Sequence, residues 1–319
     1  MNYVAGTSGA DFLAGLLKEM NEIHGLQDND LVLGGEFADR LTGDDGDDFV
    51  WGNGGSDTIE GGNGYDMLFG GEGDDVVTGG AENDYISGGK DADTIDAGEG
   101  DDYVDGNSGN DDIDGNDGSD YIFGRAGMDT LDGGNGDDYL DGGSDDDTLR
   151  ASIGNDTYVG GSGFDTLDFS RIKAHVEIDL SKNVASFTHS GVDYFSNLDS
   201  IERVVAGDQG MRATGDSGDN VFVGAAGDDW MRGKGGADVF TGGAGTDTFV
   251  WLKKDVTDGM GIDHITDFQV GEDTMQLTDF AKGGKDYGDV IRLQQTDAGV
   301  LVEGMTGGAW TGIAMLDGL

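Results

Sequence analysis

The fold is decided by a nine-residue pattern, which is clearest in the stretch Gly61-Gly62-Asn63-Gly64-Tyr65-Asp66-Met67-Leu68-Phe69. The same frame runs without a break from Gly25 to Asp168 as 16 consecutive units. In every unit the sixth residue is Asp and the eighth is apolar, and these are called position six and position eight below. An earlier unit at 6–14 carries Asp11 and Leu13 in the same places. Strict repetition at a short fixed period predicts a solenoid, in which each unit stacks on its neighbours.

The composition points to a metal as the counter-charge of the acidic residues. The 319 residues include 66 Asp or Glu against 17 Lys or Arg, and the net charge is −49. Nucleic acids and anionic membranes are poor partners for such a chain, because both need clustered basic residues. The absence of Cys excludes disulfides and thiolate sites. So much glycine and charge of one sign is typical of disorder, but hydrophobic residues recur at a fixed interval. We therefore expect a core that forms once a bound cation neutralises the carboxylates.

The repeat G-G-x-G-x-D-x-U-x resembles that of the RTX (repeats-in-toxin, haemolysin-type calcium-binding) family. The resemblance implies an all-β fold, a right-handed parallel β-roll solenoid in which two nonapeptides make one turn. It also implies multiple Ca²⁺ ions between successive loops, held by Asp carboxylates and backbone carbonyls. The pattern suits this chemistry, because Ca²⁺ takes six to eight oxygen ligands and glycines can turn carbonyls inward. Loops that pair at a spacing of two would give about 14 sites in the main run.

The aspartates at position six are the predicted calcium ligands. They are Asp11, Asp30, Asp39, Asp48, Asp57, Asp66, Asp75, Asp84, Asp93, Asp102, Asp111, Asp120, Asp129, Asp138, Asp147, Asp156 and Asp165, and in a second block Asp229, Asp238 and Asp247. Departures from the pattern predict weaker sites. The fourth residue is not Gly in loops that carry Asp28, Phe37, Glu82, Asp91 and Asp145. An acidic side chain there could still reach the ion, whereas Phe37 could not. Ala151 and Ser152 replace the glycine pair of a late unit.

Five regions follow from where the repeat starts, lapses and resumes. Residues 1–24 are a partial repeat and a capping helix, because Leu16, Leu17, Met20 and Ile23 share one helical face between Gly15 and His24. Residues 25–168 are the main β-roll, and 169–214 are a β spacer in which 175–180 alternates like a half-buried strand. Residues 215–250 are a second roll block, whose first loop has Asn220 in place of Asp and should bind poorly. Residues 251–319 are a C-terminal β cap with a predicted type I secretion signal.

The segment after the second block resembles the one that follows the β-roll in serralysin-type secreted proteins. It reads Asp263-x-Ile265-x-Asp267-Phe268-x-x-Gly271-x-Asp273-x-Met275-x-Leu277. In such proteins it precedes an uncleaved C-terminal signal that a type I exporter reads, and the apolar ending at 310–319 is compatible with one. An ordinary β cap that closes the solenoid explains the last forty residues equally well. We find no classical secretory signal at the N-terminus, and no stretch approaches the roughly 18 apolar residues of a membrane span.

Catalytic motifs do not accompany the repeats. H-E-x-x-H and G-x-S-x-G are absent, and the four histidines, His24, His175, His189 and His264, stand far apart in the sequence. Paired carboxylates for glycoside hydrolysis stay open in so acidic a chain, although nearly all of its acids have a predicted calcium role. We therefore expect a protein that is not an enzyme.

One set of outward-facing residues is apolar and aromatic, and is called the aromatic ladder below. Its members are Phe49, Trp51, Met67, Phe69, Tyr85, Tyr103, Tyr121, Phe123 and Tyr139. The opposite face carries mostly Thr and acidic residues at the same positions. Stacking within the chain is the favoured interpretation of the ladder. A self-association or partner surface and a glycan-stacking surface are the alternatives.

Together these features predict a bacterial RTX protein that is exported unfolded and folds on extracellular calcium, secreted or associated with the cell surface. A non-catalytic structural or adhesive role is the first hypothesis. The alternative is a carbohydrate-binding accessory protein or enzyme that uses the aromatic ladder. The expected partners are calcium, a type I exporter, and a second copy or a cell-surface or glycan partner, with no nucleic acid and no membrane span.

Overall fold

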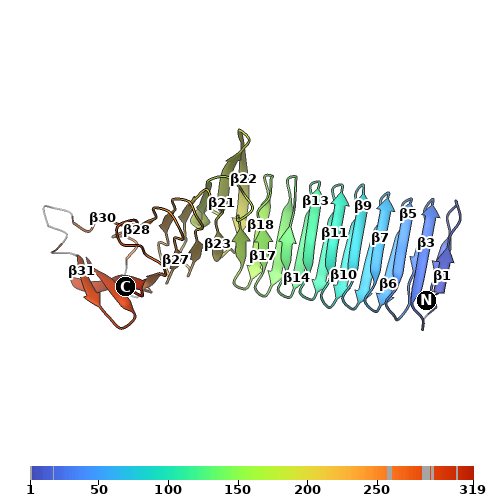
Figure 1. Cartoon of the computed structure of the whole chain (residues 1–319), viewed down its shortest axis with the longest axis horizontal. Coiled ribbons are helices and arrows are strands. Elements are labelled where there is room, and N and C mark those ends of the chain that lie inside the picture. Colours follow the sequence, from blue (N-terminus) through green and yellow to red (C-terminus); the bar gives the residue numbers. More distant parts are fainter. Residues whose placement is uncertain (1, 17, 257–260, 282–287, 289–290, 307) are drawn as a thin grey trace. The chain divides into compact units, whose positions relative to one another are not determined.

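Short strands joined by glycine-rich loops make up most of the protein (Figure 1). The computed structural model describes residues 2–16, 18–256, 261–281, 288, 291–306 and 308–319. The chain divides into two compact units, unit 1 at Met1–Asp165 and unit 2 at Thr166–Leu319. Among the described residues, every named element is a β-strand except one 3₁₀ turn, η1 (Leu180–Lys182).

Unit 1 contains two parallel sheets, one of odd-numbered and one of even-numbered strands. The odd strands are β1 (Asn2–Ala5), β3 (Asn21–Gln27), β5 (Arg40–Asp45), β7 (Thr58–Asn63), β9 (Val76–Ala81), β11 (Thr94–Glu99), β13 (Asp112–Asp117), β15 (Thr130–Asp132) and β17 (Thr148–Arg150). The even strands are β2 (Phe12–Ala14), β4 (Leu31–Leu33), β6 (Phe49–Gly54), β8 (Met67–Glu72), β10 (Tyr85–Lys90), β12 (Tyr103–Ser108), β14 (Tyr121–Ala126), β16 (Tyr139–Ser144) and β18 (Thr157–Ser162). Figure 1 shows these strands side by side from the blue end of the chain to the green part.

The register of the strands confirms the predicted turn of two nonapeptides. Each strand pairs in parallel with the strand two elements further along, so that Leu68 lies opposite Ile86 and Ile86 lies opposite Val104. Position eight of every unit points into the space between the two sheets, because alternate side chains of a strand point to opposite faces. These side chains, from Val32 to Leu167, are between 0% and 1% exposed. The parallel β-roll and its narrow core are therefore as expected from the repeat.

The predicted capping helix at Gly15–His24 is wrong. The described residues of this segment contain no helix, and β3 begins at Asn21. Ile23 is fully buried, whereas Leu16 and Met20 are 52% and 48% exposed. Asn21 and Ile23 stand nine residues before Asp30 and Val32, so the segment contains a degenerate repeat with Asn at position six and Ile at position eight. Its apolar residues are spaced as in an amphipathic helix, but β3 pairs in parallel with β5, and this pairing favours the extended conformation.

Unit 2 begins with a short strand that pairs in parallel. An antiparallel hairpin follows, and parallel pairing as in the roll then resumes. Its strands are β19 (Thr166–Asp168), β20 (Val176–Asp179), β21 (Val184–His189), β22 (Val192–Asp199), β23 (Arg203–Val205), β24 (Met211–Thr214), β25 (Val221–Val223), β26 (Trp230–Arg232), β27 (Val239–Thr241), β28 (Thr248–Leu252), β29 (Asp263–Ile265) and β30 (Thr274–Thr278). Strand β20 is the predicted half-buried strand, and it pairs with β21 antiparallel and with β24 parallel. Strand β24 in turn pairs parallel with β26, so roll-like pairing resumes within the predicted spacer rather than after it.

The C-terminal segment of unit 2 is an antiparallel meander. Strand β31 (Ile291–Gln295) pairs with β32 (Gly299–Thr306), which pairs with β33 (Ala309–Asp317). Strand β33 also lies parallel to β29, and this pairing joins the meander to the last roll strands of the unit. The part of the chain that the structure describes holds no helix with the length and apolar character needed to cross a membrane.

Candidate metal centres

The position-six aspartates of unit 1 connect each turn of the roll to the next. The backbone N–H of one aspartate donates to Oδ1 of the aspartate 18 residues later, as from Asp48 to Asp66 at 2.8 Å. Fourteen such bonds fall into two columns of alternate aspartates, one from Asp30 to Asp156 and the other from Asp39 to Asp165. All of these side chains are buried. The structure thus brings the predicted ligands into two continuous columns.

The second carboxylate oxygen, Oδ2, lacks a donor in most of these aspartates. It is buried and meets no hydrogen-bond partner among the described residues in Asp30, Asp48, Asp57, Asp66, Asp75, Asp84, Asp93, Asp102, Asp111, Asp120, Asp129, Asp138 and Asp147, and in Asp229, Asp238 and Asp247 of unit 2. A buried polar atom without a partner is costly, and more so when it carries charge. Such a row of oxygens therefore needs an external cation.

The space beside the first glycine of the repeat supplies a place for that cation. A methyl group added to Gly25 would lie 2.5 Å from Asp30 Oδ2 and 2.5 Å from the carbonyl oxygen of Gly43. The same two kinds of oxygen converge beside Gly43, Gly52, Gly61, Gly70, Gly115, Gly124 and Gly224. They also converge beside Gly34, but there the Asp39 oxygen already accepts the backbone N–H of Gly35. We call this space the cradle. Carbon cannot approach oxygen so closely, whereas 2.3–2.6 Å is the distance at which Ca²⁺ is held by oxygen ligands.

The donor set of the cradle fits calcium better than a softer metal. No point in the described part of the chain is surrounded by three or more His, Cys, Asp or Glu side chains. The cradle instead combines a carboxylate oxygen with a backbone carbonyl oxygen of the loop 18 residues further along. Oxygen ligands of this kind suit hard cations, and a flexible arrangement of many ligands suits Ca²⁺ more than Mg²⁺.

Burial raises the pKa of many position-six carboxyls, Asp57, Asp66, Asp84 and Asp238 among them, above the usual 3.8. Desolvation is the largest cause, the backbone N–H that each one accepts works in the opposite direction, and neighbouring aspartates raise the pKa further. The pKa is raised to about 8 in Asp84 and Asp238, and to about 7 in Asp57 and Asp66. The ionised columns are thus unfavourable without a counter-charge, and a divalent cation in the cradle would remove that cost.

Three predicted ligands in unit 1 differ, because the chain itself supplies donors to Oδ2. In Asp11 this oxygen accepts the backbone N–H of Thr7 and, at 2.9 Å, its hydroxyl. In Asp39 it accepts the backbone N–H of Gly35 at 2.6 Å. In Asp156 it accepts the hydroxyl of Tyr158 at 2.7 Å and that of Ser152 at 3.3 Å.

The irregular loops keep the shape of the roll in spite of their substitutions. Asp28, Glu82, Asp91 and Asp145 take the fourth position with φ between 63° and 79°, in the left-handed region that Gly would otherwise supply. The Glu82 carboxylate accepts the backbone N–H of Gly64 at 3.0 Å. Phe37 is 48% exposed and belongs to the same loop as Asp39, which is the loop predicted to bind poorly.

Unit 2 continues the same bonding with a mixed set of residues. Asp229 Oδ1 accepts the N–H of Met211 at 2.6 Å, and Asp238 Oδ1 accepts that of Asn220 at 2.9 Å. Asp263 and Asp273 then take the role of position six, because their Oδ1 atoms accept the N–H groups of Asp238 at 2.9 Å and Asp247 at 3.1 Å. Neither residue is among the ligands predicted from the repeat. The signal for them was Asp followed two residues later by Ile265 or Met275.

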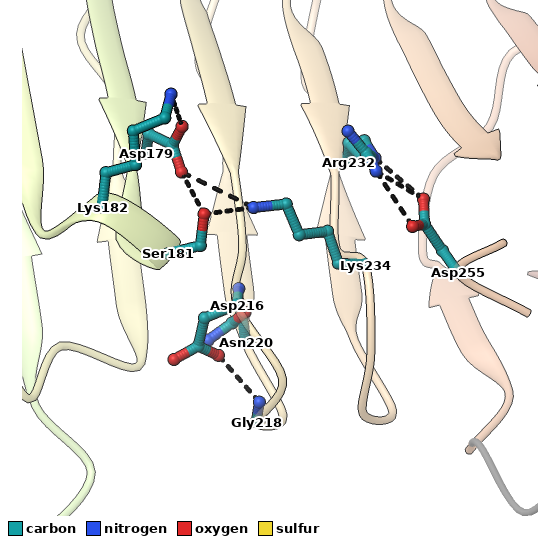
Figure 2. A network of polar contacts seen from close by, with 9 residues as sticks. All are labelled: Asp179, Ser181, Lys182, Asp216, Gly218, Asn220, Arg232, Lys234 and Asp255. Atoms are coloured by element: carbon teal, nitrogen blue, oxygen red, sulfur yellow. Dashed lines mark hydrogen bonds and ion pairs between the residues drawn. The ribbon is translucent and has the colours of Figure 1, made fainter. Parts of the chain in front are cut away.

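Other acidic residues of unit 2 have protein cations as partners (Figure 2). Arg232 donates to both carboxylate oxygens of Asp255 at 2.9 Å. Lys234 lies 3.6 Å from Asp179 and contacts Ser181 beside the 3₁₀ turn. These carboxylates are paired with Lys or Arg, whereas Oδ2 of most aspartates between Asp30 and Asp147 meets no hydrogen-bond partner in the described part of the chain.

The aromatic ladder lies on the even-numbered sheet and is connected by ring contacts. Neighbouring centroids are 5.2–6.0 Å apart along the series Phe49, Phe69, Tyr85, Tyr103, Phe123, Tyr139 and Tyr121. The rings of Tyr85 and Tyr103 are nearly parallel, at 4°. Trp51 and Met67 are each 44% exposed and Tyr121 is 56% exposed. The stacking within the chain that we favoured is present, while several members keep a free outer edge.

Two protein families match the chain. The family described as "Peptidase M10 serralysin C terminal" matches residues 128–302, more than half of the chain. The "RTX calcium-binding nonapeptide repeat (4 copies)" matches the windows 24–59, 33–68, 51–86, 69–104, 78–113 and 105–140. Among curated proteins, none gives a significant match.

Proposed function

The chain belongs to the serralysin C-terminal family and carries calcium-binding RTX repeats, and from this premise we propose that it is a secreted bacterial protein that folds when it binds extracellular calcium. The observation that carries the proposal is the row of buried Oδ2 atoms without hydrogen-bond partners in the described residues. Bound calcium supplies positive charge and oxygen coordination there, between successive loops. Because each turn contributes only two core side chains, apolar burial alone is a weak source of stability.

The same residues explain why the chain would be unfolded before export. At low calcium the carboxylates of a chain with net charge −49 repel one another, and the position-six aspartates cannot stack into their columns. Extracellular calcium modules bind with Kd on the order of 10⁻⁴–10⁻³ M, so millimolar calcium would drive folding outside the cell. The C-terminal segment of the serralysin family would be the part that a type I exporter recognises.

We further propose a non-catalytic structural or adhesive role at the cell surface. Both matching families describe repeats and a C-terminal region, and the sequence contains no protease or hydrolase motif that would add a catalytic part. The exposed edges of Trp51, Met67 and Tyr121 offer a surface for contact with a partner. A carbohydrate-binding accessory role is less favoured, because Tyr85 and Tyr103 stack on each other and hide ring faces that a sugar would need.

A calcium titration followed by circular dichroism and light scattering tests this proposal. We expect a cooperative change from coil to β-structure near millimolar calcium, with magnesium much less effective. A chain that is already folded in excess chelator would contradict the proposal. A comparison of the wild type with the double variant Tyr103→Ala, Tyr121→Ala in a glycan-binding screen separates the two roles. Loss of glycan binding would favour the accessory role, and loss of self-association alone would favour the structural one.

A further inference from the structure

A buried group of three polar residues stands where unit 1 has a calcium loop elsewhere. Asp156 and Tyr158 are fully buried, and Ser152 is 8% exposed. The Tyr158 hydroxyl donates to Asp156 Oδ2 at 2.7 Å and accepts the backbone N–H of Ser152 at 3.1 Å. The Ser152 hydroxyl lies 3.3 Å from the same carboxylate oxygen. Oδ2 of Asp156 therefore has two donors in the place where most position-six aspartates have none.

The sequence of this loop departs from the repeat at the positions that matter. Ala151 replaces the glycine of the cradle, as Ala97 does in an earlier unit, and Ser152 replaces the second glycine. Tyr158 is the only aromatic residue at position eight in the 16 units of the main run. Its ring fills the core like the aliphatic residues of the other units, and its hydroxyl extends to the loop. Two of these departures, Ser152 and Tyr158, converge on one carboxylate oxygen.

Asp156 is also the last aspartate of its column in unit 1. Asp138 donates its N–H to Asp156 Oδ1 at 3.1 Å, as in the preceding turns, so the column is intact up to this point. At the other end of the unit, Asp11 and Asp39 obtain donors for Oδ2 from Thr7 and Gly35. The aspartates between these ends keep Oδ2 without a partner in the described residues.

We propose that Tyr158 and Ser152 take the place of calcium at Asp156, so that this loop closes its column without a metal ion. The inference rests on the proposed function, because it divides the position-six aspartates into those that hold calcium and those that the chain satisfies itself. Asp39, with its donor from Gly35, belongs to the second group. In this loop the buried carboxylate of Asp156 then has its hydrogen-bond donors before calcium binds. The loop therefore gives the neighbouring turn an ordered strand on which to stack.

Calcium stoichiometry in matched variants of the full chain tests the assignment. Equilibrium dialysis with metal analysis at saturating calcium should give one ion fewer per chain for Asp138→Asn than for the wild type. Asp156→Asn and Asp39→Asn should leave the number of ions unchanged. Tyr65→Phe, which changes an exposed tyrosine, is the control for Tyr158→Phe; only Tyr158→Phe should speed up amide exchange in β18, with no change in stoichiometry.

The outcomes separate this inference from the proposed function. If Asp156→Asn loses an ion as Asp138→Asn does, calcium folding stands and the inference is overturned. An unchanged stoichiometry in Asp138→Asn would overturn it as well. If the wild type binds no calcium, the proposed function itself fails. Circular dichroism verifies that each variant is folded, and Asp66→Asn replaces Asp138→Asn if that variant does not fold.

Discussion

In most position-six aspartates the two carboxylate oxygens have different roles. Oδ1 accepts a backbone N–H from the preceding turn, as in Asp66 and Asp84, and so fixes the register of the stack. Oδ2 faces the cradle, where a cation is needed. An Asn at this position can preserve the first task but cannot offer the same charged oxygen. Asn21 and Asn220 lie in this position, and both are close to the ends of their repeat blocks.

Filling one cradle should remove one calcium ion. Gly25→Ala is expected to abolish the site of Asp30, because the added methyl group would stand 2.5 Å from two ligand oxygens. Gly54→Ala is the matched control, since its methyl group would meet nothing closer than 3.9 Å. Isothermal titration calorimetry should show one site fewer for the first variant and no loss for the second. Equal calcium binding by both variants would mean that the cradle is not the site.

Without calcium, the stability of the roll should depend on pH in a defined direction. Burial raises the pKa of Asp84 and Asp93 to about 8 from the usual 3.8. A group whose folded-state pKa is raised stabilises the fold fully below its unfolded pKa, and this contribution is lost as pH rises through the folded pKa. In excess chelator we therefore expect the β signal in circular dichroism to increase as the pH is lowered from 9 to 5, which stays above the isoelectric point of about 4.1. A flat profile over this range would contradict the role given to desolvation.

At the scale of the strand, two periods determine which side chains enter the core: the alternation of side chains along each strand and the nine-residue repeat of the sequence. The central residue of each short strand enters the core, and the flanking residues form ladders on the two outer faces. Where both periods are clear, between Gly25 and Asp168, sequence reasoning predicted the strands and core correctly. It failed at Gly15–His24, where Leu16, Leu17 and Met20 matched a helical spacing. The stacked neighbour β5, which is 18 residues away, decides the conformation there.

The aromatic ladder should contribute measurable stability between neighbouring strands. Tyr85 and Tyr103 stack with centroids 5.2 Å apart, and such pairs are worth about 0.5–1.5 kcal/mol beyond their burial. A double-mutant cycle with Tyr85→Leu and Tyr103→Leu, measured by denaturant unfolding at saturating calcium, should give a coupling energy in this range. The pair Tyr65 and Tyr103 serves as a distant control and should be additive. Additivity in both cycles would show that the ladder is an unstacked surface.

At the scale of the whole molecule, the surplus of acidic residues belongs to the interior as well as to the surface. The charge of −49 is distributed over buried columns as well as exposed loops. Salt screens exposed charges over a Debye length of about 3 Å at 1 M, but it does not fill a buried cradle. The two kinds of charge can therefore be told apart in solution.

High concentrations of NaCl should not replace calcium. In excess chelator with 1 M NaCl we expect the chain to stay expanded in small-angle X-ray scattering, and to become compact when millimolar calcium is added. MgCl₂ at the same concentration as calcium controls for divalent charge without the flexible coordination that the loops provide. Compaction by NaCl alone would mean that general repulsion, and not specific sites, keeps the chain unfolded.

The roll, its turn of two nonapeptides, its core and the columns of aspartates follow from the order of the amino acids, because these features depend on local alternation and on strict repetition. The repeat pattern also predicts that the loop with Phe37 is unlike the others. Which carboxylate oxygens lack a donor is visible only in the folded chain. The donors to Asp39 and Asp156 come from a backbone N–H and a core hydroxyl, and their direction depends on how each loop folds over the turn below it. Asp263 accepts the backbone N–H of Asp238 in the same way, although it lies 25 residues further along and outside the regular period. The repeat pattern could therefore not predict this contact.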